Sequence, residues 1–186
     1  MIFEMVSRNF SRRDFLKMAA GGVVLASALP SISWASFPDE PRELAMNNLN
    51  TGELLETCYF DGKRYLDDEL EKLNEFCRDH RRNEVHPMDR RLFDQISQIQ
   101  KLIGTDAEVI VISGYRSPLT NASLRKGASG VAKKSLHMEG KAIDFRLDGV
   151  KLSTVRDAAI SLKAGGVGYY PSSNFVHIDT GAVRSW

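Results

Sequence analysis

The chain has 186 residues, enough for one domain with a hydrophobic core, and 42% of them are hydrophobic. Its formal net charge is +1, so the composition shows no sign of the basic surface that nucleic-acid-binding proteins usually carry. Only two cysteines occur, Cys58 and Cys77, too few for a disulfide-rich scaffold or a cysteine zinc site. We expect both to be small buried side chains, with one disulfide between them as the alternative in an oxidising compartment.

The first 35 residues have the layout of an export signal. Arg12 and Arg13 precede an apolar run of small residues that extends to Leu29, and Ala35 ends a small-x-small cleavage site. The paired arginines, followed by Phe-Leu-Lys, resemble the twin-arginine signal. The apolar run is shorter than the roughly 20 residues that span a membrane, and Pro30 ends it, so we expect a cleaved signal rather than an anchor. This segment predicts delivery to the periplasm by the twin-arginine export machinery.

Residues 36–43 contain two prolines and are interpreted as a linker, which leaves residues 44–186 as the predicted domain. Helices placed before and between antiparallel strands favour an α+β domain, here a small antiparallel sheet with flanking helices. Apolar periodicity and turn residues predict its elements. In chain order they are a hairpin over 44–50 and 54–60, helices over 66–77 and 92–103, a buried strand over 109–115, a short helix and surface loop within 117–134, a strand over 141–147, a helix over 153–163, and strands over 167–170 and 175–180.

Period-two alternation in two of these strands places polar side chains on common faces. It aims Asp144 away from the apolar side of its strand, and it puts His177 and Asp179 on one face, about 7 Å apart. His137 precedes Asp144 by seven residues, and Gly140 gives the loop between them the backbone freedom to fold back. Two imidazoles and one carboxylate could therefore meet at a single metal ion. Three protein ligands leave one position of a zinc ion free, as in catalytic zinc sites, so the pattern predicts hydrolysis.

The same residues belong to longer motifs. The pattern Ser135-x-His137-x-x-Gly140-x-Ala142-x-Asp144, followed by His177-x-Asp179, resembles the signature of M15-type zinc peptidases, which include D-alanyl-D-alanine carboxypeptidases and murein endopeptidases. The segments 113–117, 130–135 and 165–181 are similar to the MepK-like murein endopeptidase branch, and the resemblance covers essentially the whole chain. It implies the compact fold shared by D-Ala-D-Ala metallopeptidases and hedgehog-like domains. It also implies that one Zn²⁺ ion is bound by His137, Asp144 and His177.

The resemblance implies one further role and leaves another open. Arg116 would stabilise the tetrahedral oxyanion, with a salt bridge at a strand end as the alternative. Members of the wider family place a Glu three residues, or a His two residues, before the last zinc ligand, but here Asn174 and Phe175 occupy these positions. Asp179 is the candidate general base, and the alternative is that it orients a ligand or a loop. Glu139 is a weaker candidate for the base.

The predicted function is that of a periplasmic zinc-dependent murein endopeptidase that hydrolyses peptide cross-links in peptidoglycan. Ser113, Tyr115 and Tyr170 are the candidate contacts to its stem peptides, although aromatic residues in strands more often belong to a core. Two alternatives are a D,D-carboxypeptidase or dipeptidase of the same family, and a non-catalytic metal-stabilised module that binds peptidoglycan. Cross-links from D-Ala to diaminopimelate and cross-links between two diaminopimelates both stay open as substrates. The oligomeric state is left open as well.

Overall fold

The computed structural model describes residues 40–127 and 131–186. The predicted export signal, residues 1–35, and residues 36–39 of the predicted linker lie outside these ranges. Within the described ranges, no helix has the length and apolar character needed to cross a membrane. The elements, in chain order, are β1 (Pro41–Asn48), β2 (Leu54–Asp61), α2 (Asp67–Phe76), α3 (Arg91–Ile103), β3 (Val109–Ser113), α4 (Pro118–Gly127), η3 (Leu136–Glu139), β4 (Ala142–Leu147), α5 (Leu152–Leu162), β5 (Gly166–Tyr170), η4 (Pro171–Ser173), β6 (Phe175–Asp179) and β7 (Arg184–Ser185).

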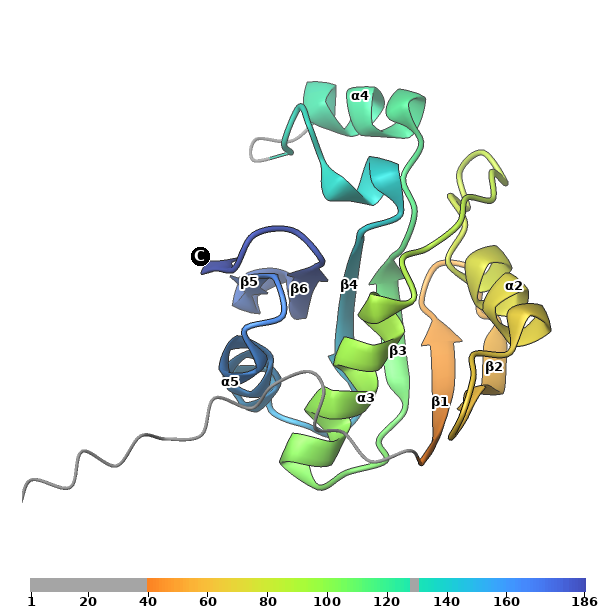
Figure 1. Ribbon diagram of the computed structural model, residues 1–186. Coiled ribbons are helices and arrows are strands. Elements are labelled where there is room, and N and C mark those ends of the chain that lie inside the picture. The colour runs from red at the N-terminus through yellow and green to blue at the C-terminus, as the bar shows by residue number, and fades with distance from the viewer. Residues whose placement is uncertain (1–39, 128–130) are drawn as a thin grey trace, which may run out of the picture. The chain divides into compact units, whose positions relative to one another are not determined.

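A seven-stranded sheet in the order β2-β1-β3-β4-β6-β5-β7 forms the centre of the domain (Figure 1). Most neighbouring strands are antiparallel, but β1 runs parallel to β3 and β5 runs parallel to β7. The predicted α+β class is confirmed, while the sheet is mixed rather than purely antiparallel. The parallel β1–β3 pair arises because α2 and α3 carry the chain across β1, from its β2 side to its β3 side.

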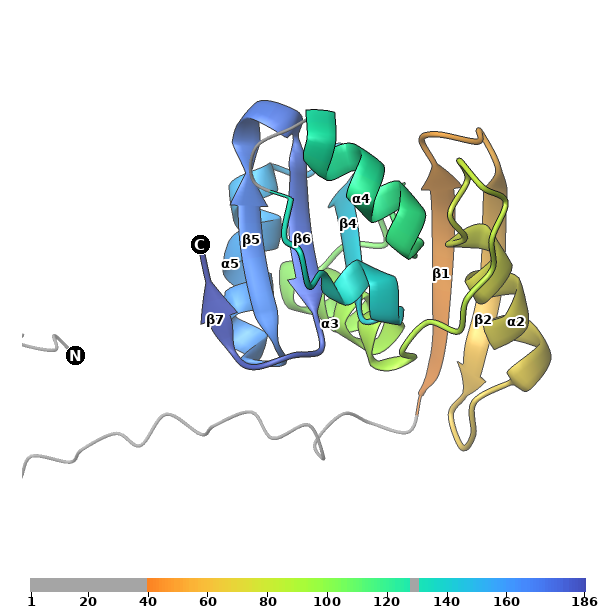
Figure 2. The same ribbon diagram turned by 90° about the horizontal axis from the view of Figure 1, so that it is seen from above.

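The hydrophobic core lies between one face of the sheet and the helices α2, α3 and α5. Figure 2 views the sheet from the side of α4 and η3, with α3 and α5 behind it. Alternation in β4 directs Ile143 and Phe145 into the core, where both are 0% exposed, and therefore directs Asp144 to the opposite face. The largest fully buried side chains come from both layers: Tyr59, Phe93, Phe145, Met46, Leu73, Leu92, Ile96, Ile99, Ile143, Leu147, Ile178 and Val109.

Strand β1 begins at Pro41, so residues 41–43 are part of the sheet rather than of a linker. Proline is tolerated as the first residue of a strand because no ladder hydrogen bond is needed from its nitrogen there. Arg42 donates a hydrogen bond to Asp94 of α3 (2.5 Å), and the hydroxyls of Tyr59 and Tyr65 donate to the same carboxylate (3.3 and 2.7 Å). This buried network fixes the start of β1 against α3, which the proline-rich composition did not indicate.

Both cysteines are free thiols. Cys77 is 0% exposed in the core, and burial raises the pKa of its thiol to about 12. Cys58 is half-buried in β2, where its Sγ lies 3.4 Å from the carbonyl oxygen of Phe60. These environments match the expectation of small apolar side chains rather than that of a disulfide.

Candidate metal centre

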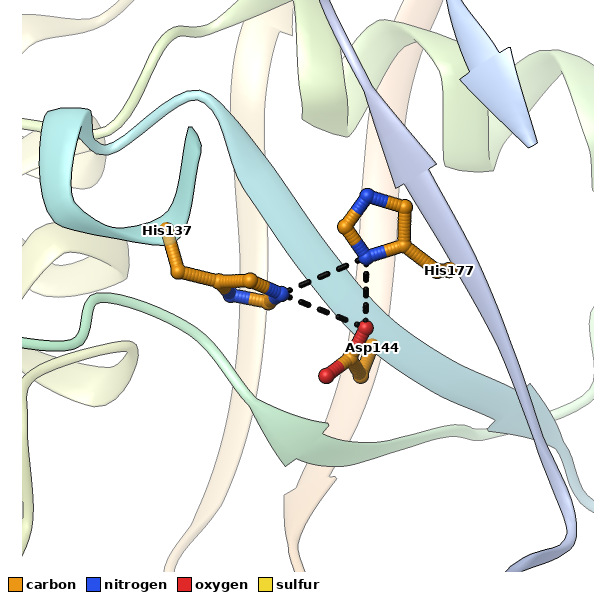
Figure 3. Close-up of side chains that lie close together, drawn as sticks. All are labelled: His137, Asp144 and His177. Atoms are coloured by element: carbon orange, nitrogen blue, oxygen red, sulfur yellow. Dashed lines mark hydrogen bonds and ion pairs between the residues drawn. The ribbon is translucent and has the colours of Figure 1, made fainter. Parts of the chain in front are cut away.

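Three side chains from three elements converge on the face of the sheet opposite α3 and α5 (Figure 3). His137 belongs to η3, Asp144 to β4 and His177 to β6. Asp144 and His177 lie directly opposite each other in the antiparallel β4–β6 ladder. His137 reaches them because Gly140 ends η3 with a left-handed φ of 65°, which turns the chain from η3 into β4. The structure therefore brings together the three residues that the motif singled out.

The distances between the ligand atoms suit one small cation. His137 Nε2 lies 3.3 Å from both His177 Nδ1 and Asp144 Oδ1, and His177 Nδ1 lies 2.8 Å from Asp144 Oδ1. Donor atoms around a tetrahedral zinc ion with bonds of about 2.0–2.1 Å are about 3.3 Å apart. His137 and Asp144 are 3% and 6% exposed, so the protein keeps them largely away from solvent. This donor set fits zinc.

Neighbouring acceptors determine which ring nitrogens face the centre. The carbonyl oxygen of Gly114 lies 2.7 Å from His137 Nδ1, so this nitrogen carries the proton and Nε2 keeps a lone pair. A carboxylate oxygen of Asp179 lies 3.3 Å from His177 Nε2, which leaves the lone pair of the neutral ring on Nδ1. Two nitrogen lone pairs and one carboxylate oxygen then point at the same place. Such an arrangement is stable only with a cation or a proton between them.

The electrostatics of the site agree with this conclusion. Burial lowers the pKa of His177, but hydrogen bonds to the carboxylates of Asp144 and Asp179 outweigh it and raise the pKa to about 9. Burial raises the pKa of Asp144, but His137 and His177 outweigh it, and the pKa lies well below its usual range. The centre thus favours an ionised carboxylate with a balancing positive charge, which a bound metal ion supplies in place of the proton.

Arg116 lies beside this centre, just beyond the end of β3. Its Nη2 is 3.7 Å from Asp144 Oδ2 and donates to Ser113 Oγ at 3.3 Å. Burial lowers the pKa of Arg116 and outweighs the opposing effect of Asp144. Among the described residues, its buried Nε has no hydrogen-bond partner. Arg116 therefore combines a partly desolvated positive charge with an unused donor.

Asp179 is completely buried, and both of its carboxylate oxygens already accept hydrogen bonds. Oδ1 accepts from the backbone N–H groups of Gly166 and Gly181, each at 2.9 Å, and Oδ2 accepts from Arg184 Nη2 at 2.5 Å. Burial alone would raise the pKa of Asp179, but the hydrogen bonds from His177, Arg184 and the two glycines hold it well below its usual range. A carboxylate of this kind holds His177 in position and is poorly suited to take up a proton from water.

The candidate substrate contacts occupy different environments. Tyr115 is 6% exposed, stacks on His86 with ring centroids 4.6 Å apart and donates its hydroxyl proton to Glu84 at 3.0 Å. Ser113 is engaged with Arg116. Tyr170 is 36% exposed at the end of β5. The structure therefore leaves Tyr170 free to meet a ligand and buries Tyr115.

One residue beside the centre had no place in the predicted site. The indole of Trp186 lies next to the ring of His177, with centroids 5.4 Å apart. The only sequence signal for this contact is a pair of glycines at alternate positions of β5, Gly166 and Gly168, because missing side chains on one face of a strand leave room for another segment.

A mixed α+β sheet that presents two histidines and one aspartate beside a largely buried arginine defines the class of metal-dependent hydrolases. A family described as "Peptidoglycan L,D-endopeptidase MepK" matches residues 36–186 of the chain. The chain therefore belongs to this M15 family of peptidases, which confirms the resemblance found in the sequence motifs.

Individual relatives agree with the family match. The peptidoglycan L,D-endopeptidase MepK of Escherichia coli strain K12 is 52% identical over 179 residues, which cover 95% of the chain and 97% of the relative. The Shigella flexneri protein of the same name has the same identity and coverage. A probable peptidoglycan L,D-endopeptidase MepK of Haemophilus influenzae strain Rd is 48% identical over 180 residues, which cover 95% of each chain. The similarity thus extends over nearly the full length of each protein.

Proposed function

We propose that this peptidase is a zinc-dependent murein endopeptidase that hydrolyses L,D peptide cross-links of peptidoglycan in the periplasm. The convergence of His137, Asp144 and His177, with their lone pairs aimed at one point, carries the zinc dependence. The names of the relatives support the substrate and the bond type. The twin-arginine motif within residues 1–35 supports export to the periplasm by that route.

Zinc at such a site lowers the pKa of water toward neutrality and polarises a carbonyl group. The protein's own residues supply the geometry. Arg116 presents guanidinium N–H groups beside Asp144, where they can donate to the oxygen that becomes negative when the scissile carbonyl is attacked. Because Arg116 is largely buried, its charge is poorly screened and does not need to reorganise during the reaction.

We assign Asp179 to orientation rather than to proton transfer. Its two oxygens accept from Gly166, Gly181 and Arg184 as well as facing His177, so the carboxylate cannot turn toward a substrate without breaking buried hydrogen bonds. Glu139 is exposed and pairs with Lys141 at 2.8 Å, so it is directed away from the centre. Of the two roles expected for Asp179, this geometry therefore favours the orientation of a metal ligand, His177, over that of a general base.

The experiment is a digest of purified peptidoglycan sacculi containing both cross-link types, with the products resolved by mass after release of the muropeptides. We expect the zinc-loaded protein to consume dimers joined through two diaminopimelates, which link an L-centre to a D-centre, and to leave dimers joined through D-Ala intact. A chelator should abolish the cleavage, and added zinc should restore it.

Two histidine variants provide the control. His137→Ala should lose both stoichiometric zinc and cleavage, whereas His80→Ala, which removes a histidine outside the centre, should keep both. Intact cross-links after incubation with protein that contains one zinc per chain would refute the endopeptidase function. Retention on sacculi without turnover would then favour the binding module.

A further inference from the structure

Two partly exposed aromatic side chains lie on the face of the sheet that carries the metal centre. Trp186 is 51% exposed and Tyr170 is 36% exposed. The Trp186 ring lies 5.4 Å from the ring of the ligand His177, and Tyr170 stacks on Phe175 with centroids 4.6 Å apart. Exposed aromatic surface beside a polar site is characteristic of a binding surface rather than of a core.

The fold holds Trp186 in place through its backbone. Strand β7 pairs with β5, and the N–H and carbonyl groups of Trp186 bond to Val167 (3.1 Å) and Tyr169 (3.0 Å). Gly168 lies directly opposite His177 in the sheet, and a Cβ atom there would come within 2.8 Å of both the Trp186 and the Tyr170 rings. The absence of a side chain at Gly168 therefore lets both rings lie over β5.

The two rings are joined by a hydrogen bond that leaves one donor free. Trp186 Nε1 donates to Tyr170 Oη at 2.8 Å, so the tyrosine oxygen acts as the acceptor. Within residues 40–127 and 131–186, the hydroxyl proton of Tyr170 has no acceptor. A hydroxyl that already accepts a hydrogen bond is a better donor, because chained hydrogen bonds polarise one another. The aromatic surface thus carries a single polarised O–H group at its edge.

We propose that Trp186 and Tyr170 form a substrate subsite for an amphipathic residue of the stem peptide, one with an aliphatic chain that ends in a carboxylate. The aliphatic part lies along the two rings, and the Tyr170 hydroxyl donates to the carboxylate. Diaminopimelate has this chemistry, while alanine is too short to cover both rings. The inference rests on the proposed function and extends it by naming what selects the substrate residue next to the scissile bond.

The charges around the two rings suit this ligand. Arg184 lies over Trp186, with its guanidinium carbon 5.0 Å from the ring centroid, and its side chain is 45% exposed. Arg184 also pairs with the buried Asp179 carboxylate, so its charge is partly balanced, and the Tyr170 hydroxyl is the main contact offered to the ligand's carboxylate.

The first test compares two synthetic cross-linked peptide dimers. One contains diaminopimelate, and in the other the side-chain carboxylate of each diaminopimelate is a carboxamide, which removes its negative charge and keeps the aliphatic chain and the D-centre at the scissile bond. The wild type should prefer the first by kcat/KM, and Tyr170→Phe should reduce this preference about tenfold by slowing only the diaminopimelate substrate. Trp186→Ala should raise KM about tenfold for both dimers with little change in kcat.

Tyr169→Phe is the matched control, because Tyr169 projects from the other face of β5, where Arg156 lies 4.6 Å over its ring. This variant should behave as the wild type does. A Tyr170→Phe enzyme that keeps the wild-type preference, or a Trp186→Ala enzyme with unchanged KM, would overturn the subsite.

A binding measurement separates failure of the subsite from failure of the proposed function. The chain has two tryptophans, so in the full-length Trp34→Phe variant the fluorescence comes from Trp186 alone. A stem tripeptide with diaminopimelate should change this emission and bind about tenfold more tightly than the carboxamide tripeptide, and Tyr170→Phe should remove the difference. If no dimer is cleaved, such a response still supports the subsite, and the absence of any response overturns it.

Discussion

At the scale of single residues, groups outside the candidate ligand set determine which atoms of His137 and His177 face the candidate metal centre. The Gly114 carbonyl and the Asp179 carboxylate each select one nitrogen of a histidine ring. Asp179 in turn is fixed by Arg184 and by two backbone N–H groups. The orientation of His177 therefore depends on a chain of hydrogen bonds that reaches from β6 through β5 to β7.

Replacing Asp179 with asparagine tests this dependence. In the variant, the amide N–H group of the asparagine would face N–H donors that now bond to the Asp179 carboxylate. The His177 ring would lose its acceptor and turn more freely. We expect Asp179→Asn to weaken zinc binding by about 10–100-fold, as the loss of a partner of a ligand typically does. Zinc affinity is measured by competition with a chromogenic chelator. Unchanged affinity together with a large loss of kcat would indicate instead that Asp179 is the general base.

Arg116 should affect turnover rather than metal binding. Arg116→Lys keeps the charge but loses the planar fork that reaches both a substrate oxygen and Ser113. We expect kcat to fall by roughly 100-fold or more, comparable to the loss of one oxyanion donor, with zinc content unchanged. Steady-state kinetics on a cross-linked dimer, with zinc measured in the same samples, would check this. A variant with wild-type kcat would show that Arg116 forms a salt bridge with Asp144 and does not contribute to turnover.

At the scale of elements, the turn between η3 and β4 decides whether His137 reaches the other two ligands. Gly140 has a φ of 65°, and a Cβ atom there would overlap the carbonyl oxygen of Pro87. The backbone on both sides of this turn is fixed by hydrogen bonds, for example from the N–H of Asp89 to the Gly140 carbonyl at 2.8 Å. The turn therefore has little freedom to adapt to a side chain.

Two glycine variants separate backbone strain from packing. Gly149 has nearly the same φ, 68°, but nothing lies within 4 Å of a Cβ atom there. Gly149→Ala should thus cost only about 1 kcal/mol of unfolding free energy, because of the left-handed backbone. Gly140→Ala adds a clash and should cost about 3 kcal/mol or more, with weaker zinc binding. Urea denaturation with and without zinc measures both, and equal losses would contradict the role given to the Gly140 turn.

Sequence patterns predicted the helices and strands that are long enough to show a repeat of apolar and polar residues, and they missed the elements that are too short to show one. Alternation over six residues of β4 was enough to separate Asp144 from Ile143 and Phe145. The two residues of β7 are too few to show a period, so Trp186 was not connected with the site. Asp179 was seen on the correct face of β6, but its role depends on Arg184, a contact that no local pattern encodes. The parallel β1–β3 pair was missed because α2 and α3 separate its strands along the chain, and the β5–β7 pair was missed because β7 is too short to predict.

At the scale of the whole molecule, buried polar contacts join segments that are far apart in the sequence. Asp79, which is 2% exposed in the loop after α2, accepts hydrogen bonds from the N–H groups of Arg81 (3.1 Å) and Ser117 (3.0 Å). The adjoining backbone is linked as well, through the N–H of Tyr115 and the carbonyl of Cys77 at 2.8 Å. These contacts attach the segment that carries Arg116 to the rest of the domain.

The Asp79 contacts predict a pH dependence of stability. Burial raises the pKa of Asp79, but hydrogen bonds from Thr120, Ser117 and Arg81 outweigh it and lower the pKa below its usual value. The stabilisation is therefore fully present above the usual value of about 4 and is lost as the pH falls through the lower folded value. Asp79→Asn should cost about 1–3 kcal/mol at pH 7, and its difference from the wild type should shrink below about pH 4.

Chemical denaturation at a series of pH values checks this prediction. Asp148→Asn serves as the control, because Asp148 is exposed in the turn after β4. It should leave stability unchanged at pH 7. A constant difference between wild type and Asp79→Asn from neutral to acid pH would show that the Asp79 charge does not contribute.

The place of the ligands in the strand order has a kinetic consequence. Asp144 and His177 lie on β4 and β6, two adjacent interior strands, whose amides should be among the slowest to exchange with solvent. His137 sits instead in a four-residue turn, which can open locally while the sheet stays intact. Release of a bound ion would then need only the opening of η3, so a chelator should remove the ion far faster than the protein unfolds. The metal-free domain should keep its sheet and rebind the ion without refolding.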